Sequence, residues 1–367
     1  MDLYKLNRRK SLKQISLGSA AILSGLSSMA CASQDSQRKS LGIALVGLGN
    51  YATNALAPAF ASTRHCHLAG IVTGTPAKAE KWKKDFDIPE KNMYNYETFG
   101  QIADNEDIDI IYIVLPNSLH TEYTIKAAEA GKHVICEKPM ALNAKECSLM
   151  ISACKKAGVK LSIGYRLHFE KHHQEAMRLG QEKIYGKVRF MEGGLAFRVR
   201  NTQLWRLDAK LGGGGAIMDL GVYPLQATRY ITGEEPISVT AQGYNTAPDI
   251  YKDIYESINF QLEFPSGALA NISTSYGYYL DRFRAASEKG WFELNPAFNG
   301  TGTEGITSEG KMGFEKVAQQ AEQMDNFSIC IQEGKESRVS GQEGLKDMII
   351  VDKIKEAIES GRKIALI

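Results

Sequence analysis

Three side chains that stand far apart in this sequence could transfer a proton together: Lys138, Asp219 and Tyr223. A lysine can hold a substrate hydroxyl and electrostatically favour loss of its proton. A nearby ammonium also lowers the pKa of a tyrosine phenol from about 10 toward the range of a general base. Because Asp219 and Tyr223 are four residues apart, they share one face if this stretch is helical. The set therefore indicates acid–base chemistry on a hydroxyl group.

An ordinary structural role is open for each member of this set. A lysine that follows a strand commonly lies at the surface, and a buried tyrosine can simply donate its hydroxyl to a buried aspartate. Lys138 follows a predicted strand within Glu137-Lys138-Pro139, where Pro139 biases it away from helical geometry. In a parallel sheet this places Lys138 at the carboxyl edge, where α/β proteins bind ligands.

A glycine-rich loop follows the first apolar run of the chain. Gly47 permits a tight turn, Gly49 lets the backbone approach a pyrophosphate, and Ala52 lets helix and strand pack closely. The phosphates would then lie at a helix N-terminus. A glycine triplet alone is weak evidence, but this one lies between a predicted strand and a predicted helix. We therefore expect dinucleotide binding by Gly47, Leu48, Gly49, Asn50 and Tyr51.

The end of the second predicted strand indicates which dinucleotide is bound. An NAD site usually has Asp or Glu there to hold the ribose 2′-hydroxyl. This chain has Thr73-Gly74-Thr75, followed by Lys78. Small hydroxyl residues and a lysine can bind a 2′-phosphate, and no acid is present to repel it. The sequence favours NADP over NAD, although Lys78 could equally be a solvated helix residue.

The pattern of apolar runs predicts an α/β protein with two domains. Short continuous runs alternate with helical stretches over residues 41–163, as in a Rossmann domain whose strands are buried on both faces. Asn143 and Glu146 form a capping-box pattern at the start of one helix. The predicted strands are Ile43–Val46, His67–Thr73, Ile108–Leu115, His133–Cys136 and Lys160–Ile163.

The pattern of apolar and polar residues changes in residues 164–343, where longer strand-like runs alternate in polarity. This indicates an α+β domain with a largely antiparallel open sheet, which we expect to bind substrate and to form oligomers. The predicted strands are Val188–Leu195, Ile237–Tyr244, Ser257–Phe264 and Ala268–Tyr276. A final helix at 344–360, within the segment 344–367, is expected to pack back on the first domain.

The N-terminus resembles an export signal. Arg8-Arg9 precedes an apolar run of 16 residues that is too short and too polar for a spanning helix. We interpret residues 1–32 as a twin-arginine signal read by the twin-arginine export machinery, and 33–40 as a polar linker. A general secretory signal is the alternative, and Cys31 could carry a lipid anchor. A twin-arginine signal exports a folded protein, so we expect a periplasmic enzyme that leaves the cytoplasm with its cofactor and must regenerate it.

Composition excludes several other classes of function. The net charge of +2 gives no indication of a nucleic-acid partner or an anionic membrane. The five cysteines after Cys31 lack Cys-x-x-Cys or metal-ligand spacing, so we expect small buried hydrophobic side chains and no metal site.

Taken together, five motifs in this order resemble the Gfo/Idh/MocA oxidoreductase family, and within it the glucose–fructose oxidoreductases. The likeness covers essentially the whole chain after the leader. The motifs are Gly47-x-Gly49-x-x-Ala52, Leu115-Pro116-Asn117-Ser118-Leu119-His120, Glu137-Lys138-Pro139, Gly164-Tyr165-Arg166 and Asp219-x-Gly221-x-Tyr223.

The resemblance implies roles for particular residues. Lys138 would orient a sugar and promote proton loss, Asp219 would bind hydroxyls, and Tyr223 would be the acid/base. Asn117 and His120 would line the nicotinamide side. The remaining contacts with the cofactor and sugar would come from Leu115, Glu137, Arg166, Trp205 and Arg206. For Trp205 and Arg206, a core tryptophan beside a surface arginine is an equal alternative.

The expected activity is oxidation of an aldose at C1 to its lactone, with the hydride passed to a second sugar by a ping-pong scheme on retained NADP. The resemblance also implies a homo-oligomer, either a dimer or a tetramer. Two other enzymes are open: a sugar dehydrogenase with exchangeable NAD(P), and an NAD-assisted glycoside hydrolase. A third class is a ligand-binding protein without activity, which the intact Lys138, Asp219 and Tyr223 set disfavours.

Overall fold

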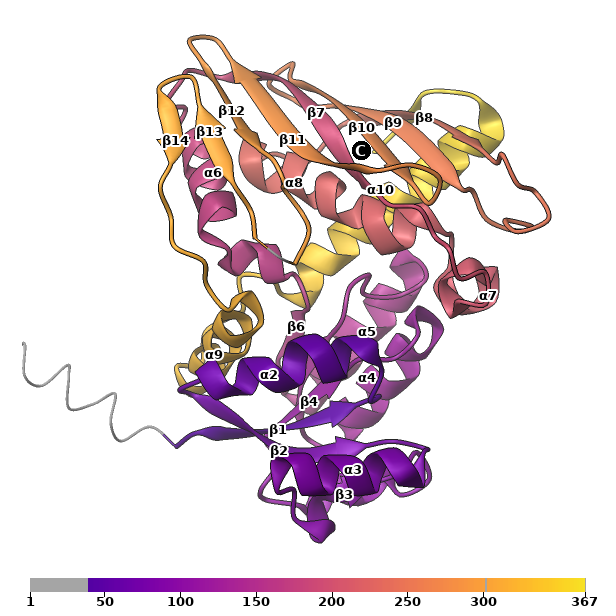
Figure 1. Cartoon of the computed structure of the whole chain (residues 1–367), viewed down its shortest axis with the longest axis vertical. Coiled ribbons are helices and arrows are strands. Elements are labelled where there is room, and N and C mark those ends of the chain that lie inside the picture. Colours follow the sequence, from indigo (N-terminus) through magenta and orange to yellow (C-terminus); the bar gives the residue numbers. More distant parts are fainter. Residues whose placement is uncertain (1–38, 301, 367) are drawn as a thin grey trace, which may run out of the picture. The chain divides into compact units, whose positions relative to one another are not determined.

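The first half of the chain forms a six-stranded parallel sheet whose strands are joined by helices (Figure 1). The computed structural model describes residues 39–300 and 302–366, so the predicted export signal and most of the linker lie outside the described residues. The strand order is β3-β2-β1-β4-β5-β6, which reverses between β1 and β4. The strands are β1 (Leu41–Val46), β2 (Cys66–Val72), β3 (Met93–Tyr94), β4 (Ile110–Ile113), β5 (His133–Cys136) and β6 (Leu161–Ile163).

The central strands of this sheet are buried on both faces, as their continuous apolar runs predicted. In β1, Ile43 and Leu45 pack in one core cluster and Ala44 and Val46 in another, because successive side chains point to opposite faces. The first cluster includes Phe327 of a late helix. Rossmann topology and strand burial thus confirm the predicted fold class for this half.

Helices cover both faces of the parallel sheet. The helix after β1 starts at Asn50 and contains a π-helical turn at Ala52–Leu56, α2 (Ala57–Ala59) and a final 3₁₀ turn at Phe60–Ser62. The others are α3 (Pro76–Phe86), α4 (His120–Glu129) and α5 (Ala144–Ala157). The start of α5 is the predicted capping box, in which Asn143 Oδ1 accepts from the Glu146 N–H at 3.0 Å.

The second half forms a nine-stranded sheet in the order β14-β13-β12-β11-β7-β10-β9-β8-β15. Its neighbouring strands are antiparallel except β7 and β10, which run parallel. The predicted strands are present with ends shifted by at most one residue, while the strands after residue 279 were not predicted. The strands are β7 (Val188–Ala196), β8 (Ser238–Tyr244), β9 (Ser257–Glu263), β10 (Leu269–Ser275), β11 (Leu280–Ser287), β12 (Trp291–Leu294), β13 (Gly305–Thr307), β14 (Gly310–Met312) and β15 (Ile364–Ala365).

Three helices lie between the two sheets in Figure 1 and cover one face of the larger one. They are α6 (Lys171–Gln181), α8 (Val222–Thr232) and α10 (Gly341–Ser360). Helix α10 packs against α5 and β6 of the first half and against β8 of the second. It begins three residues before the predicted start at 344. A further helix that the sequence analysis missed, α9 (Gln319–Gln332), packs on the helix after β1 and on β2.

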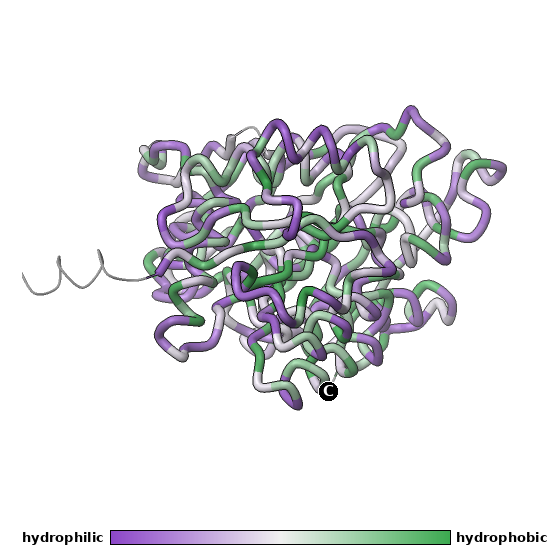
Figure 2. The backbone as a smooth tube through the Cα atoms, turned by 90° about the horizontal axis from the view of Figure 1, so that it is seen from below, coloured by the Kyte–Doolittle hydropathy of each residue, from purple (hydrophilic) through white to green (hydrophobic). Residues whose placement is uncertain are grey.

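Apolar stretches run through the interior of the molecule, and polar stretches follow its periphery (Figure 2). The five described cysteines are all buried and free. Burial raises the pKa of the Cys66 and Cys154 thiols to about 12, which makes them unreactive. None of the helices in the described part of the chain is long and apolar enough to cross a membrane.

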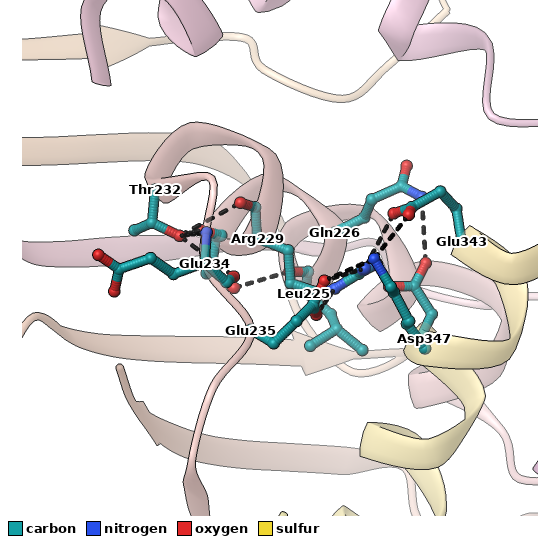
Figure 3. A network of polar contacts seen from close by, with 10 residues as sticks. Leu225, Gln226, Arg229, Thr232, Glu234, Glu235, Glu343 and Asp347 are labelled. Atoms are coloured by element: carbon teal, nitrogen blue, oxygen red, sulfur yellow. Dashed lines mark hydrogen bonds and ion pairs between the residues drawn. The ribbon is translucent and has the colours of Figure 1, made fainter. Parts of the chain in front are cut away.

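A buried ion network joins the end of α8 to α10 (Figure 3). The Arg229 guanidinium donates to both oxygens of Glu235 at 2.6 and 2.9 Å, to Glu343 at 2.9 Å and to Asp347. Asp347 is fully buried on α10 and also accepts from the Gln226 amide at 3.1 Å. The network therefore holds the C-terminal half of α8 against α10.

Candidate active site

A cavity of about 870 Å³ lies where the carboxyl ends of the parallel strands face the N-terminal side of α8. Loops that follow β1, β2, β4 and β5 form one wall, and residues 195–223 supply much of the other. This is the edge at which the strand order reverses, where α/β sheets bind ligands. Of the predicted site residues, the cavity is lined by Gly47, Leu48, Gly49, Asn50, Tyr51, Thr73, Gly74, Thr75, Lys78, Leu115, Asn117, Glu137, Lys138, Arg166, Trp205, Arg206, Asp219 and Tyr223.

The glycine loop has the geometry that a dinucleotide cradle needs. Gly47 has φ +94°, and a Cβ there would lie 2.6 Å from the Val114 carbonyl oxygen. A Cβ on Gly49 would meet no atom within 4 Å, because this residue opens onto the cavity. The helix begins directly afterwards at Asn50, so first-turn N–H groups are available for phosphate oxygens. These residues fit a pyrophosphate.

The end of β2 lies beside the glycine loop. Thr73 is buried, and its hydroxyl oxygen accepts from the Thr75 N–H at 3.3 Å. The exposed Lys78 donates to the Leu48 carbonyl oxygen at 3.1 Å. Lys78 therefore bends over the cavity mouth and is not a purely solvated helix residue.

The charges around the cavity suit a polyanion. Among the described lining residues, four are cationic (Lys78, Lys138, Arg166 and Arg206) and two carry carboxyl groups (Glu137 and Asp219). Burial raises the pKa of Glu137. A dinucleotide with a 2′-phosphate would balance this positive excess.

The three proposed catalytic residues meet in the cavity. The Lys138 Nζ donates to the Asp219 carbonyl oxygen at 2.6 Å and lies 3.7 Å from Asp219 Oδ1. The same ammonium lies 4.5 Å from the centre of the Tyr223 ring. Asp219 belongs to a π-helical turn, Ile217–Gly221, directly before α8, and Tyr223 lies in the first turn of α8. Lys138 precedes a cis peptide bond to Pro139. Lys138 and Tyr223 both line the cavity. Lys138 is therefore not an ordinary surface lysine, and Tyr223 is not an ordinary core tyrosine.

The Asp219 carboxylate is held at both oxygens. Arg206 Nε donates to Oδ1 at 3.0 Å, and the Tyr276 hydroxyl donates to Oδ2 at 3.3 Å. Arg206 also lies over the Trp205 ring, 4.4 Å from its centre. Trp205 is half-buried and faces the cavity, so the alternative of a core tryptophan is wrong. Asp219 is thereby fixed in orientation, and its remaining lone pairs can accept substrate hydroxyls.

Arg166 supports Tyr223 from a second side. It follows β6, is buried, and lies with Cζ 5.2 Å from the Tyr223 ring centre. Its guanidinium donates to Gln319 of α9 and to the Phe298 carbonyl oxygen. Two cations therefore flank the Tyr223 ring, at distances typical of cation–π contacts.

Of the predicted cofactor residues, His120 does not reach the cavity. It is fully buried, with Nδ1 2.9 Å from the Pro139 carbonyl oxygen and Nε2 2.9 Å from the Leu115 carbonyl oxygen. It therefore links the loops after β4 and β5 from beneath. His120 is the first residue of α4, and its two carbonyl partners hold its ring in the interior. Burial lowers the pKa of His120.

Several lining residues were missed by the sequence analysis. Phe197 and Tyr276 follow β7 and β10, which run parallel and so end at the same edge. That parallel pairing is the signal that could have identified them, but the sequence indicated antiparallel strands. The others have no distinctive motif: Tyr96, Leu195, Leu204, Met218 and Asn299.

Comparison with known protein families identifies both halves. Residues 41–165 match the model described as "Oxidoreductase family, NAD-binding Rossmann fold", and residues 173–293 match the GFO/IDH/MocA C-terminal domain. The chain therefore belongs to the Gfo/Idh/MocA family of oxidoreductases.

Individual relatives agree with this assignment. D-xylose 1-dehydrogenase [NADP(+)] of Haloarcula marismortui is 30% identical over 335 residues, covering 88% of this chain and 92% of the relative. The structure of aldose-aldose oxidoreductase from Caulobacter crescentus, complexed with glycerol, is 42% identical with a TM-score of 0.87. That match covers 89% of this chain and 100% of the other.

Proposed function

We propose that this protein is an NADP-containing aldose oxidoreductase that oxidises one aldose at C1 to its lactone and reduces a second sugar with the same hydride. The observation that carries the proposal is the joint placement of Lys138, Asp219 and Tyr223 in one cavity with a dinucleotide loop. The likeness to an aldose-aldose oxidoreductase and to an NADP-dependent xylose dehydrogenase supports sugars as substrates.

In this mechanism Tyr223 moves the proton. Lys138 holds the C1 hydroxyl, and Tyr223, which lies between Lys138 and Arg166, takes its proton as the general base. Asp219 accepts a neighbouring hydroxyl and so orients the ring. The chemistry that a bound nicotinamide supplies is reversible acceptance of a hydride from a carbon atom.

The second sugar restores the starting state. The first sugar has lost a hydride and a proton in becoming the lactone. Tyr223, now a phenol, returns the proton to the carbonyl oxygen of the second sugar as its carbon gains the hydride. The net reaction converts two aldoses into one lactone and one alditol, or uses a ketose as the acceptor, with no net change in cofactor.

NADP is proposed over NAD because of the residues after β2. Thr73, Thr75 and Lys78 offer hydroxyl and ammonium groups, and the four cations around the cavity favour the extra phosphate. The residues that would hold the pyrophosphate are those of the glycine loop.

We also propose export through Arg8-Arg9 to the periplasm, with Cys31 as a candidate lipid anchor, because external nicotinamide is scarce and a self-restoring cycle needs none. A homo-oligomer, dimer or tetramer, remains part of the proposal. The polar face of the sheet formed by β8, β9 and β10 offers a surface for it.

The test uses protein from residue 33 onward, purified without added nucleotide. Addition of glucose should produce the fluorescence of a reduced nicotinamide, and a second sugar should then remove it. An empty protein that responds only to added NADP would indicate a conventional dehydrogenase. Release of a coloured aglycone from a glycoside would indicate a hydrolase.

A further inference from the structure

A strap of chain in the second half of the molecule reaches the first half beside the cavity. The strap, residues 197–216, leaves β7 and ends at the helical turn that carries Asp219. It contains a 3₁₀ turn at Trp205–Leu207 and α7 (Ala209–Gly212). Helix α7 contacts the turn Asn117–Leu119 after β4, so the strap reaches the dinucleotide-binding half.

The strap forms part of the cavity wall. Leu204, Trp205, Arg206, Gly212 and Gly215 all line the cavity, opposite the glycine loop and the end of β2. A ligand that extends from the glycine loop to Tyr223 would therefore lie alongside the strap. Such a ligand could leave in this direction only if the strap moved.

Two side chains from other elements, and one of the strap's own, hold the strap in place. The Asn117 amide donates to the Gly212 carbonyl oxygen at 2.8 Å. The Lys355 Nζ, from α10, donates to the Gly213 carbonyl oxygen at 3.0 Å. At the other end of the cavity wall, Arg206 of the strap itself binds Asp219. Of the two anchors from outside, Lys355 lies away from the cavity lining.

The glycine run makes the lysine contact possible. Gly213, Gly214 and Gly215 have φ values of +86°, +157° and +68°, which other residues rarely adopt. A Cβ on Gly213 would lie 2.7 Å from Leu142 Cδ2, so the run is pressed against the first half of the molecule. A glycine run has little stiffness of its own, and its position must be set by side chains that bind it. Burial lowers the pKa of Lys355 because it removes the ammonium from water.

We propose that Lys355 is a positioning residue for cofactor retention, which acts by holding the Gly213 carbonyl and keeping the strap closed beside the bound dinucleotide. The inference rests on the proposed function only in requiring that the cavity binds NADP(H). Slow release matters for the proposed function, because a cycle without external nucleotide requires that NADP(H) dissociates more slowly than the enzyme completes one catalytic cycle.

The experiment measures release of NADPH without any sugar. The protein from residue 33 onward is loaded with NADPH, mixed with excess NADP, and followed by loss of the bound-nucleotide fluorescence. Lys355→Met should raise the release rate about tenfold or more, since a hydrogen bond from a charged donor is lost. The matched control is Lys353→Met on the same helix, whose ammonium pairs with Glu356 at 2.8 Å, and it should release NADPH at the wild-type rate.

Two further variants keep the proposal open to disproof. Lys355→Arg retains a donor and should restore slow release to within about threefold of wild type. Asp208→Ala removes the exposed cap whose carboxylate accepts from the Lys210 and Leu211 N–H groups at the start of α7, and it should also speed release. This variant replaces Lys355→Met if the latter does not fold.

Wild-type release rates in both Lys355→Met and Asp208→Ala would overturn the strap proposal and leave the proposed function intact. Fast release in Lys355→Met with no sugar-dependent cycle in the wild type would overturn the proposed function and support the strap. Failure of the wild type to bind NADPH would contradict both.

Discussion

The two ends of α8 handle charge in opposite ways. At its C-terminal end, Arg229 faces three carboxylates, Glu235, Glu343 and Asp347, and its side chain is only 3% exposed. At its N-terminal end, Tyr223 lies between Lys138 and Arg166 in a cavity where cations outnumber carboxyl groups. The C-terminal end around Arg229, the structural end, satisfies its charges within the protein. The N-terminal end around Tyr223, the chemical end, leaves positive charge for a ligand. The same helix therefore carries a structural ion network at one end and borders a cavity with an excess of positive charge at the other.

The largest effect should come from Tyr223→Phe at the chemical end. Loss of the proton-transferring hydroxyl should lower the sugar-dependent rate by about 10²–10⁴-fold, with NADPH binding retained. Tyr230→Phe is the matched control, because Tyr230 lies on the same helix and binds His173 at the structural end. It should lower stability by about 1–3 kcal/mol and leave the rate per folded molecule nearly unchanged. Equal loss of rate in both variants would contradict the assignment of the chemical step to the N-terminal end of α8 alone.

Arg229→Met should break the structural end. It leaves the buried Asp347 carboxylate without its cation, which should lower the free energy of unfolding by about 3–5 kcal/mol in urea denaturation. Arg189→Met removes an exposed pair with Glu288 and should cost at most about 1 kcal/mol. A shift for Arg229→Met no larger than that of the control would show that the network contributes little.

Mild acid should weaken the structural end. Burial lowers the pKa of His168 to about 3 and that of His173 to about 4, so both stay neutral in the folded protein. The unfolded chain takes up a proton on each below about pH 6.5, and stability therefore falls as the pH falls. Between pH 7 and 5.5 these two histidines should cost about 2.5 kcal/mol together, because the slope of about 1.4 kcal/mol per pH unit for each is approached only below the unfolded pKa of about 6.5.

His168→Phe tests the source of this acid sensitivity, because it removes one of the two titrating groups. Urea denaturation at pH 7 and pH 5.5 should show about half of the wild-type loss. An unchanged pH dependence would assign the sensitivity to other groups.

The smallest effect should come from Tyr276→Phe, which tests whether the hydrogen bond to Asp219 orients this carboxylate for the sugar. Asp219 would keep Arg206 but lose the donor on Oδ2, so its orientation toward the sugar would loosen. We expect KM for the sugar to rise about tenfold, as for one hydrogen bond to a charged group, with kcat changed much less. Tyr251→Phe, on the ring stacked 6.4 Å from Tyr276, should leave KM unchanged. A fall in kcat with constant KM would instead give Tyr276 a part in the chemical step.

The sequence predicted the chemical end better than the structural end. Gly47 and Lys138 belong to motifs that follow β1 and β5, and parallel strands bring such motifs together at one edge. Asp219 and Tyr223 belong to a single local motif on adjoining helical turns. The ion network could not be predicted in this way, because Arg229 and Asp347 are 118 residues apart and nothing in either local sequence names the other. His120 shows the same limit within a motif, since its orientation depends on carbonyl groups of two loops. The strands β12 to β14 were missed because they are short and lack a sustained alternation in polarity.

Isotopic labelling of the transferred hydride tests most directly whether the cofactor stays bound between oxidation of the first sugar and reduction of the second. Protein from residue 33 onward is given glucose deuterated at C1, an unlabelled second aldose and an excess of free unlabelled NADP, and the products are analysed by mass spectrometry. A retained cofactor predicts one deuterium in the alditol formed from the second aldose, and none in the free nucleotide. Deuterium that accumulates in free NADPH, with an unlabelled alditol or none, would contradict the self-restoring cycle.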